Sequence, residues 1–296
     1  MNLYYLKSFY VTVKKNSISK ASKELHLTQP GLSLQLQALE KDLGVCLLTR
    51  SNKGVVLTEA GQVLYDYADT ILSLQESVER DISNITEEKQ RLIVGSCKAI
   101  GEYALPCSIY VFKNDNDHID IQLEIINTEE VVTSLINRKI NVGIVSNEPK
   151  NKKLKYKKIT SDKLLLVTSL PLVKDSITID ELKQLPLIFR EKGSGTREAV
   201  EEVLKNNGID KSELNIIYEL NSMEAIKTSV VSGKGISFIP ELSIKRELKD
   251  GILKPITIEG LEFNIEYYLC HLKEYKCETP EMSFEKFIMS SKRGFC

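Results

Sequence analysis

Residues 28–44 read Thr-Gln-Pro-Gly-Leu-Ser-Leu-Gln-Leu-Gln-Ala-Leu-Glu-Lys-Asp-Leu-Gly, and this stretch decides the fold of the first part of the chain. Its leucines recur at helical spacing, which predicts one buried stripe formed by Leu32, Leu36, Leu39 and Leu43. Thr28 is a good N-cap, Pro30 is tolerated in the first turn, and Gly44 is a common stop signal. We therefore expect a helix between Thr28 and Gly44.

The opposite side of this helix is polar and carries Gln29, Ser33 and Gln37. Such side chains donate and accept hydrogen bonds, as base edges and phosphate oxygens require, and glutamine can pair bidentately with adenine. A shorter helix is expected after Ser17, and a tight turn at His26 joins the two. This arrangement is typical of a helix-turn-helix that enters the major groove of DNA. A plain three-helix bundle remains an alternative for residues 17–39 alone.

The flanks of this region add a first helix and a basic hairpin. Apolar residues at helical spacing predict an amphipathic helix over residues 3–13, and residues 47–57 predict a small hairpin with Arg50 and Lys53 near its tip. Residues 1–60 hold eight Lys and Arg against four Asp and Glu, although the whole chain has a net charge of −1. This local surplus suits a polyanionic partner, so the hairpin is interpreted as a wing that contacts phosphates or a minor groove.

The region combines the motifs Ser17-Ile-Ser-Lys-Ala-Ser-Lys-Glu-Leu25, Leu27-Thr-Gln-Pro-Gly-Leu-Ser33, Gln35-Leu-Gln-Ala-Leu-Glu40, Leu43-Gly44 and Leu57-Thr-Glu-Ala-Gly61. Together they resemble the winged-helix domain of LysR-type transcriptional regulators. Where that family usually has an arginine after the serine of the third helix, this chain has Leu34, which could lie against a thymine methyl group. The residues expected to contact DNA are Gln29, Pro30, Ser33, Leu34, Gln37, Arg50 and Lys53.

A long helix is expected after Thr58, which is a credible N-cap. One narrow apolar seam runs along it, formed by Leu64, Tyr67, Ile71, Leu74, Val78, Ile82 and Ile85, which predicts pairing with a second copy. Binding to a membrane surface is the alternative, but anionic lipid would repel acidic residues of the polar face such as Asp66 and Glu79. The resemblance implies a linker helix that pairs antiparallel with that of a second subunit, followed by a charged hinge at residues 87–91.

Short apolar strands alternate with helices through the rest of the chain. Strands are expected at residues 92–95, 119–126, 141–145, 164–168, 187–189, 214–219, 235–239 and 267–271. Helices are expected at residues 102–112, with an early break at Pro106, and at residues 129–138, 196–206, 222–232 and 282–289. This alternation predicts a parallel sheet. Two α/β lobes that exchange strands would place a ligand cleft between them, beyond the carboxyl ends of the strands. The resemblance implies a fold similar to that of periplasmic binding proteins.

The predicted architecture is an N-terminal all-α winged helix-turn-helix, a long linker helix and a C-terminal α/β domain of two lobes. The expected limits are residues 1–58 for the DNA-binding domain, 59–90 for the linker and hinge, and 91–296 for the effector-binding domain. Within the last domain, lobe I comprises residues 91–161 and 266–296, and lobe II comprises residues 162–265.

The sequence Arg190-Glu-Lys-Gly-Ser-Gly-Thr-Arg197 follows an expected strand and opens an expected helix. Its glycines permit a tight turn, and the first N–H groups of a helix attract anions. Its hydroxyls and final guanidinium complete a predicted site for a small oxyanion, made by Gly193, Ser194, Gly195, Thr196 and Arg197. A glycine turn with an ordinary Ser or Thr cap is the alternative. The spacing of a nucleotide-binding P-loop is absent.

Three more segments are expected to face the same cleft. LysR-type regulators carry effector-binding residues at these places, so the resemblance adds Ser96, Cys97, Lys98, Thr128 and Asn221. Lys98 stands where serine or threonine is common in the family, and its charge favours a dianion; a solvated surface lysine is the alternative. Cys97 would lie at a helix N-terminus beside Lys98, and both features lower a thiol pKa, so redox sensing is a minor hypothesis.

Composition and missing motifs exclude several classes of protein. The chain has 296 residues, of which 42% are hydrophobic and 27% charged, a globular composition with room for two domains. Its six cysteines show no Cys-x-x-Cys pair and are expected to be reduced thiols. We expect no metal, cofactor or catalytic residue, since the histidines lack ligand spacing and no nucleophile motif occurs. The absence of a signal peptide or a spanning apolar run predicts a cytoplasmic protein.

The sequence thus predicts a LysR-type regulator that binds double-stranded operator DNA and responds to a small anionic effector. A dimer through the linker helix and a tetramer are expected, with RNA polymerase as a candidate partner and no membrane. The alternative is an anion-binding or catalytic α/β protein whose N-terminal helices mediate protein contacts. The basic wing and the polar face of residues 29–37 argue against that alternative.

Overall fold

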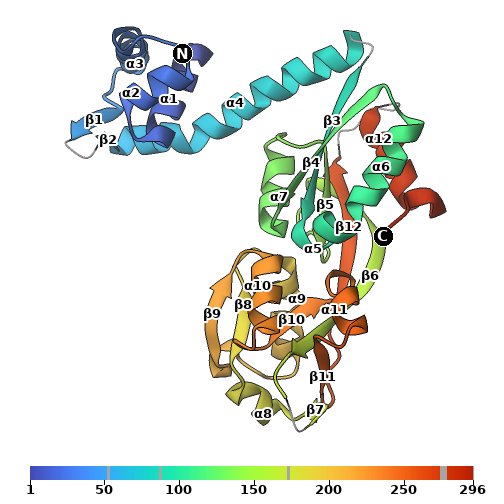
Figure 1. Ribbon diagram of the computed structural model, residues 1–296. Coiled ribbons are helices and arrows are strands. Elements are labelled where there is room, and N and C mark those ends of the chain that lie inside the picture. Colours follow the sequence, from blue (N-terminus) through green and yellow to red (C-terminus); the bar gives the residue numbers. More distant parts are fainter. Residues whose placement is uncertain (52–53, 87–88, 172–173, 274–278, 296) are drawn as a thin grey trace. The chain divides into compact units, whose positions relative to one another are not determined.

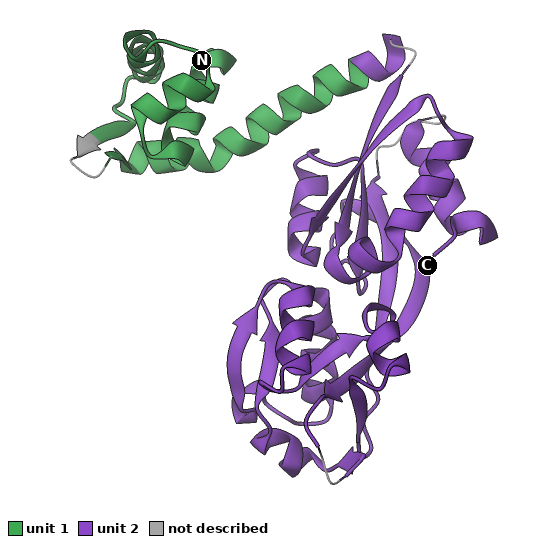
Figure 2. Ribbon diagram, in the orientation of Figure 1, with its two compact units in different colours: residues 1–82 green, residues 83–296 purple. Residues whose placement is uncertain are grey.

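The computed structural model describes residues 1–51, 54–86, 89–171, 174–273 and 279–295. It divides into two compact units, unit 1 with residues 1–82 and unit 2 with residues 83–296 (Figure 2). Each unit has its own hydrophobic core.

Unit 1 is a bundle of helices with a two-stranded wing (Figure 1). Its elements are α1 (Leu3–Lys15), α2 (Ile18–Glu24), α3 (Gln29–Leu43), β1 (Leu48–Ser51), β2 (Gly54–Leu57) and α4 (Glu59–Thr86), the last of which runs on into unit 2. The Thr28 hydroxyl accepts the Gly31 N–H at 3.2 Å, and Gly44 ends α3 with a φ of 70°, as the sequence predicts. Leu32 and Leu39 are fully buried, each contributing about 1.5–3 kcal/mol of hydrophobic stabilisation. Leu43, also expected in that stripe, is 40% exposed.

The wing is held against the bundle by specific polar contacts. The Glu40 carboxylate accepts the N–H groups of Leu47 and Leu48 at 2.7 and 3.2 Å. On the other strand, the Asn16 side chain accepts the Val55 N–H at 2.9 Å. These bonds satisfy backbone donors that a bare hairpin would leave to water, and they fix the direction of the wing relative to α3.

Unit 2 consists of two α/β lobes, as predicted. Lobe I is built from β3 (Gln90–Cys97), α5 (Lys98–Tyr103), α6 (Leu105–Asp115), β4 (Ile119–Ile126), α7 (Thr128–Ile136), β5 (Val142–Ser146), α12 (Pro280–Met289) and η3 (Ser291–Arg293). Lobe II is built from β7 (Ser176–Ile177), α8 (Ile179–Gln184), β8 (Leu187–Arg190), α9 (Gly195–Asn206), η1 (Lys211–Glu213), β9 (Ile216–Leu220), α10 (Met223–Val231), β10 (Ser237–Pro240), η2 (Glu241–Ser243), α11 (Lys245–Lys249) and β11 (Lys254–Ile258). Two further strands, β6 (Leu154–Thr168) and β12 (Asn264–Leu272), connect the lobes.

Strand β6 runs through both lobes without a break (Figure 1). Residues 154–163 pair with β12, whereas residues 164–168 pair with β10 and β11. The main sheet has the order β4-β3-β5-β12-β6-β11-β7, and β8 pairs with β9 beside it. Both lobes are therefore attached to one continuous strand.

The expected parallel sheet is only partly correct. Strand β3 pairs parallel with β4 and β5, and β8 pairs parallel with β9. Strand β12, however, pairs antiparallel with β5 and β6, because it returns from lobe II without a crossover helix. The early break expected at Pro106 in the helix of residues 102–112 is present, since the structure divides this region into α5 and α6, with Pro106 in the first turn of α6.

Candidate functional site

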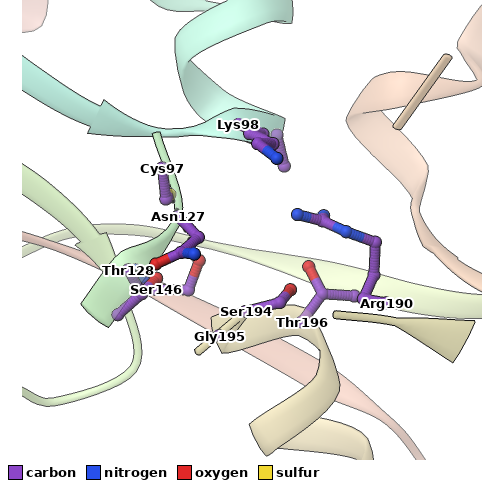
Figure 3. Close-up of a pocket in the computed structure, with 10 residues that line it drawn as sticks. Cys97, Lys98, Asn127, Thr128, Ser146, Arg190, Ser194, Gly195 and Thr196 are labelled. Atoms are coloured by element: carbon purple, nitrogen blue, oxygen red, sulfur yellow. Dashed lines mark hydrogen bonds between the residues drawn. The ribbon is translucent and has the colours of Figure 1, made fainter. Parts of the chain in front are cut away.

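A small pocket lies between the lobes of unit 2 (Figure 3). It is lined by Cys97, Lys98, Ala99, Asn127, Thr128, Ser146, Arg190, Ser194, Gly195 and Thr196. Lobe I supplies residues at the ends of β3, β4 and β5, and lobe II supplies the end of β8 and the start of α9. The pocket therefore lies at the carboxyl ends of strands, where ligands of α/β proteins bind.

Helix α9 directs its N-terminus into this pocket. The N–H groups of Gly195, Thr196 and Arg197 have no acceptor among the residues that the structure describes. Ser194 is the N-cap residue, but its side chain makes no capping hydrogen bond, and its hydroxyl points with that of Thr196 toward the space facing Lys98 (Figure 3). Free N–H groups and the positive end of the helix dipole make this terminus suitable for an anion.

Glycine is required at position 195 because the lobes approach closely there. A Cβ at Gly195 would lie 2.4 Å from the Ser146 Cβ and 3.0 Å from the Ser146 carbonyl oxygen. The side chain of Asn147 also donates to the Gly195 carbonyl at 2.8 Å. Helix α7, by contrast, caps itself, since Asn127 and Glu130 exchange hydrogen bonds in a capping box.

Two cations face the pocket from opposite lobes. Lys98 lies at the start of α5. Arg190 is the last residue of β8, and its guanidinium extends toward Lys98 (Figure 3). Both contact Glu191: Arg190 Nε and Nη2 donate to its two carboxylate oxygens at 2.8 and 3.0 Å, and Lys98 Nζ lies 3.2 Å from Oε1. Burial alone would raise the pKa of Glu191, but its hydrogen bonds with Arg190 and the neighbouring positive charges hold it below its usual value.

Arg197, whose guanidinium was expected to complete the anion site, does not line this pocket. Its guanidinium is 5% exposed and donates to Glu201 and Glu219, both at 2.8 Å, and to the Arg190 carbonyl at 2.9 Å. These contacts hold α9 against β8 and β9, so the charge of Arg197 is already balanced by carboxylates. Arg190, which the sequence reasoning missed, supplies the guanidinium at the pocket instead.

The other expected effector residues are divided between the pocket and its surroundings. Cys97, Lys98, Thr128, Ser194, Gly195 and Thr196 line it, whereas Ser96, Gly193 and Asn221 do not. The Ser96 hydroxyl is buried and donates to the Cys97 carbonyl at 3.1 Å, and the Asn221 carbonyl accepts a hydrogen bond from Lys98. Gly193, with a φ of 80°, accepts the Glu129 N–H of lobe I at 3.2 Å, so this turn joins the lobes. Asn127 and Ser146 line the pocket but were not expected from the sequence.

Cys97 does not have the lowered pKa that a reactive thiol needs. Burial raises the pKa of Cys97 to about 11, although a hydrogen bond from the Ser146 hydroxyl, at 3.2 Å from its Sγ, acts in the opposite direction. The expectation of a lowered pKa is therefore wrong. Cys107 is disulfide-bonded, so the expectation that all cysteines are reduced is wrong there, because spacing along the chain does not show which cysteines meet in space.

The rate of alkylation tests the raised pKa of Cys97. At pH 8 we expect iodoacetamide to label the exposed Cys46 quickly and Cys97 hardly at all, because a thiol with a pKa of about 11 is only about one part in a thousand thiolate at that pH. Mass spectrometry of a time course checks this. Faster labelling of Cys97 than of Cys46 in folded protein would contradict the raised pKa.

The expected DNA-reading face lies on the outside of α3. Gln29, Pro30, Leu34 and Gln37 are exposed and Ser33 is half-buried, with Leu34 66% exposed. The Gln29 amide donates to the Ser19 hydroxyl at 3.3 Å, which ties the start of α3 to α2. Lys53 and the side chain of Arg50 lie outside the described residues.

Helix α4 carries an exposed apolar seam along its length. The exposed members are Tyr67, Leu74, Val78, Ile82 and Ile85, whose side chains are between 47% and 84% exposed. Leu64 and Ile71 are partly buried against the hydrophobic core of unit 1. The seam expected from the sequence is thus present and uncovered in one copy of the chain. No helix in the described part of the chain is long and apolar enough to cross a membrane.

A helix-turn-helix with a wing, joined to a two-lobed unit with a pocket between the lobes, defines a class of DNA-binding regulators with a ligand-binding domain. Family models agree with this class. Residues 3–62 match the bacterial regulatory helix-turn-helix protein, lysR family, and residues 86–277 match the LysR substrate binding domain.

Known proteins of this kind match nearly the whole chain. A probable RuBisCO transcriptional regulator of Cyanidioschyzon merolae is 32% identical over 280 residues, 89% of each chain. The HTH-type transcriptional activator CmpR of Synechocystis is 30% identical over 291 residues, which cover 97% of this chain and 95% of CmpR. The chain belongs to the LysR family of transcriptional regulators.

Solved structures agree on the fold. The crystal structure of CbnR, a LysR family transcriptional regulator, has a TM-score of 0.74 at 22% identity and covers 97% of this chain and 98% of CbnR. The regulatory domain of Synechocystis CcmR in complex with 2-PG has a TM-score of 0.60 at 26% identity, covering 67% of this chain and 95% of that domain. The predicted family and fold class are confirmed.

Proposed function

We propose that this LysR-type regulator binds operator DNA through unit 1 and senses a small anion in the pocket of unit 2. One observation carries the proposal: the N–H groups of Gly195 and Thr196, which have no acceptor among the described residues, lie at one pocket between two lobes together with Lys98, Arg190 and two hydroxyls. An oxyanion would satisfy these donors together, because each of its oxygens accepts several hydrogen bonds. The complex of the related CcmR domain with 2-PG makes 2-PG the first compound to test.

On the DNA side, we assign the base contacts to the exposed face of α3. Gln29, Ser33 and Gln37 would bond to base edges, Pro30 would shape the start of the helix, and Leu34 would pack on a thymine methyl group. Arg50 and Lys53 of the wing would contact phosphates.

The exposed apolar seam of α4 favours a dimer in which this helix pairs with the same helix of a second copy. We propose further that two such dimers join into a tetramer. The dimer would set the spacing of two half-sites. A cytoplasmic location and regulation without catalysis complete the proposal.

Gln37→Ala tests the reading face. We expect operator affinity to fall about 5- to 150-fold, because a bidentate base contact is worth about 1–3 kcal/mol, while the thermal midpoint stays unchanged at this exposed position. Fluorescence anisotropy with the operator and with a scrambled duplex measures the change. An equal loss on both duplexes would contradict a base contact at Gln37.

The proposed function as a whole is tested with the full chain and the DNA upstream of its own gene, titrated by anisotropy across a range of salt concentrations. We expect saturable binding that only this DNA competes for, and a change in affinity or in complex size when 2-PG or inorganic phosphate is added. Binding without any response to anions would refute the sensing part. No DNA binding by folded protein would instead favour an anion-binding protein whose helices contact other proteins.

A further inference from the structure

The cationic side of the pocket is already occupied by a carboxylate of the chain itself. Glu191 directly follows β8 and uses both of its oxygens, Oε2 toward Arg190 Nε at 2.8 Å and Oε1 toward Arg190 Nη2 at 3.0 Å. This fork-to-fork arrangement is the one that an external carboxylate or phosphate adopts on an arginine. Lys98 adds a third contact, at 3.2 Å from Oε1.

These contacts also cross between the lobes. Arg190 and Glu191 belong to lobe II, whereas Lys98 begins α5 of lobe I. Lys98 donates as well to the Asn221 carbonyl of lobe II. The three charged side chains are largely buried, 16% exposed for Lys98, 4% for Arg190 and 19% for Glu191, so water screens their attraction only weakly. Glu191 therefore links the two lobes through the same cations that face the pocket.

We infer that Glu191 is a tethered competitor that holds the cationic side of the pocket until a dianion displaces it. The inference rests on the proposed function, since it concerns the same pocket. It names the ligand class: a small anion with two negative charges, able to satisfy Lys98, Arg190 and the first turn of α9 at once.

Charge balance explains why the number of ligand charges matters. Counted over these three side chains alone, Lys98 and Arg190 with Glu191 in place leave one net positive charge. Glu102 also interacts with both cations, and its contribution is the same whichever anion is bound. A monoanion that replaced Glu191 would leave the same net charge, so it gains little in exchange for the contacts it breaks. A dianion neutralises both cations, and in a partly desolvated site that difference is large. Glu191 thus sets a charge threshold for the effector.

Glu191→Gln tests this inference in the full-length protein. Sulfate is the dianionic probe and methanesulfonate is a monoanion of similar shape; both keep their charge from pH 6 to 9, so titration of the ligand does not interfere. By calorimetry we expect the Kd of sulfate to fall at least about tenfold in the variant. We expect no measurable binding of methanesulfonate to the wild type and measurable binding to the variant.

Glu213→Gln is the matched control. Its carboxylate also pairs with a lysine, Lys183 at 2.8 Å, and accepts a backbone N–H, but it lies on η1 away from the pocket. Sulfate affinity should be unchanged there. If Glu191→Gln fails to fold, Glu191→Asp provides the test of the inference. Its carboxylate is shorter by one methylene and cannot reach both cations equally well, so this variant should bind sulfate about threefold more tightly than the wild type.

The outcomes separate the inference from the proposed function. Unchanged or weaker sulfate binding in folded Glu191→Gln, with clear binding by the wild type, overturns the tethered competitor and leaves the anion pocket intact. No binding of sulfate, phosphate or 2-PG by either protein overturns the pocket and the inference together.

Discussion

Replacing Arg190 by alanine is expected to weaken the binding of sulfate or 2-PG at least about 100-fold, because the change removes a charged donor that can form two hydrogen bonds to an anion, each worth about 1.5–3 kcal/mol. Operator binding in the absence of effector should stay near the wild-type value, since Arg190 lies in unit 2 and the reading helix in unit 1. Calorimetry measures the first effect and fluorescence anisotropy the second.

Arg197→Ala is the informative comparison, because Arg197 lies in the same short motif but is bonded to Glu201 and Glu219. There we expect the main loss in the thermal stability of unit 2, of about 1–3 kcal/mol given that both carboxylates are partly exposed, with a smaller change in anion affinity. If Arg197→Ala abolished anion binding in a stable protein and Arg190→Ala did not, the assignment of the two arginines would have to be reversed.

Gly61→Ala is expected to destabilise unit 1 severely. Gly61 lies in the first turn of α4, and a Cβ there would be 2.0 Å from the Leu47 carbonyl oxygen and 3.1 Å from a methyl group of Leu57. The obstacle is backbone, so the start of α4 and the wing must move apart, at a cost of at least about 2–3 kcal/mol. Operator binding should fall by at least about tenfold because the wing is displaced from α3.

Gln62→Ala, at the exposed neighbouring position in the same turn, is the control and should leave both properties nearly unchanged. Thermal unfolding and anisotropy of the two variants provide the comparison. A Gly61→Ala protein as stable as Gln62→Ala would show that the wing and α4 are not in contact as described.

Periodicity and capping predicted unit 1 well because local signals determine it. The caps at Thr28 and Gly44 and the seam of α4 all follow from residues within one or two turns of each other. Strand β6 shows the opposite case. Its lysines at positions 155, 157 and 158 interrupt the apolar pattern, so only its last third was predicted, although pairing with β12 defines the full strand.

The pocket shows the same limit at the level of single side chains. The motif of residues 190–197 was found from its glycines and hydroxyls, but linear order does not reveal which arginine faces the ligand. A signal was present, since Arg197 and Glu201 are four residues apart on one helix face and such pairs often bind each other. Arg190, the last residue of a buried strand, points into the crevice where strands end, a position that only the tertiary arrangement defines.

The continuity of β6 has a mechanical consequence for signalling. If loops joined the two lobes, a hinge motion could open the cleft between them widely. Here the switch from one pairing partner to another falls between Lys163 and Leu164, inside a hydrogen-bonded strand, so no flexible segment separates the lobes at that point. We therefore expect relative motion of the lobes to take the form of twist in β6 and β12, a small rotation rather than a wide opening. Binding of an effector in this pocket would then change the twist of the two strands that join the lobes.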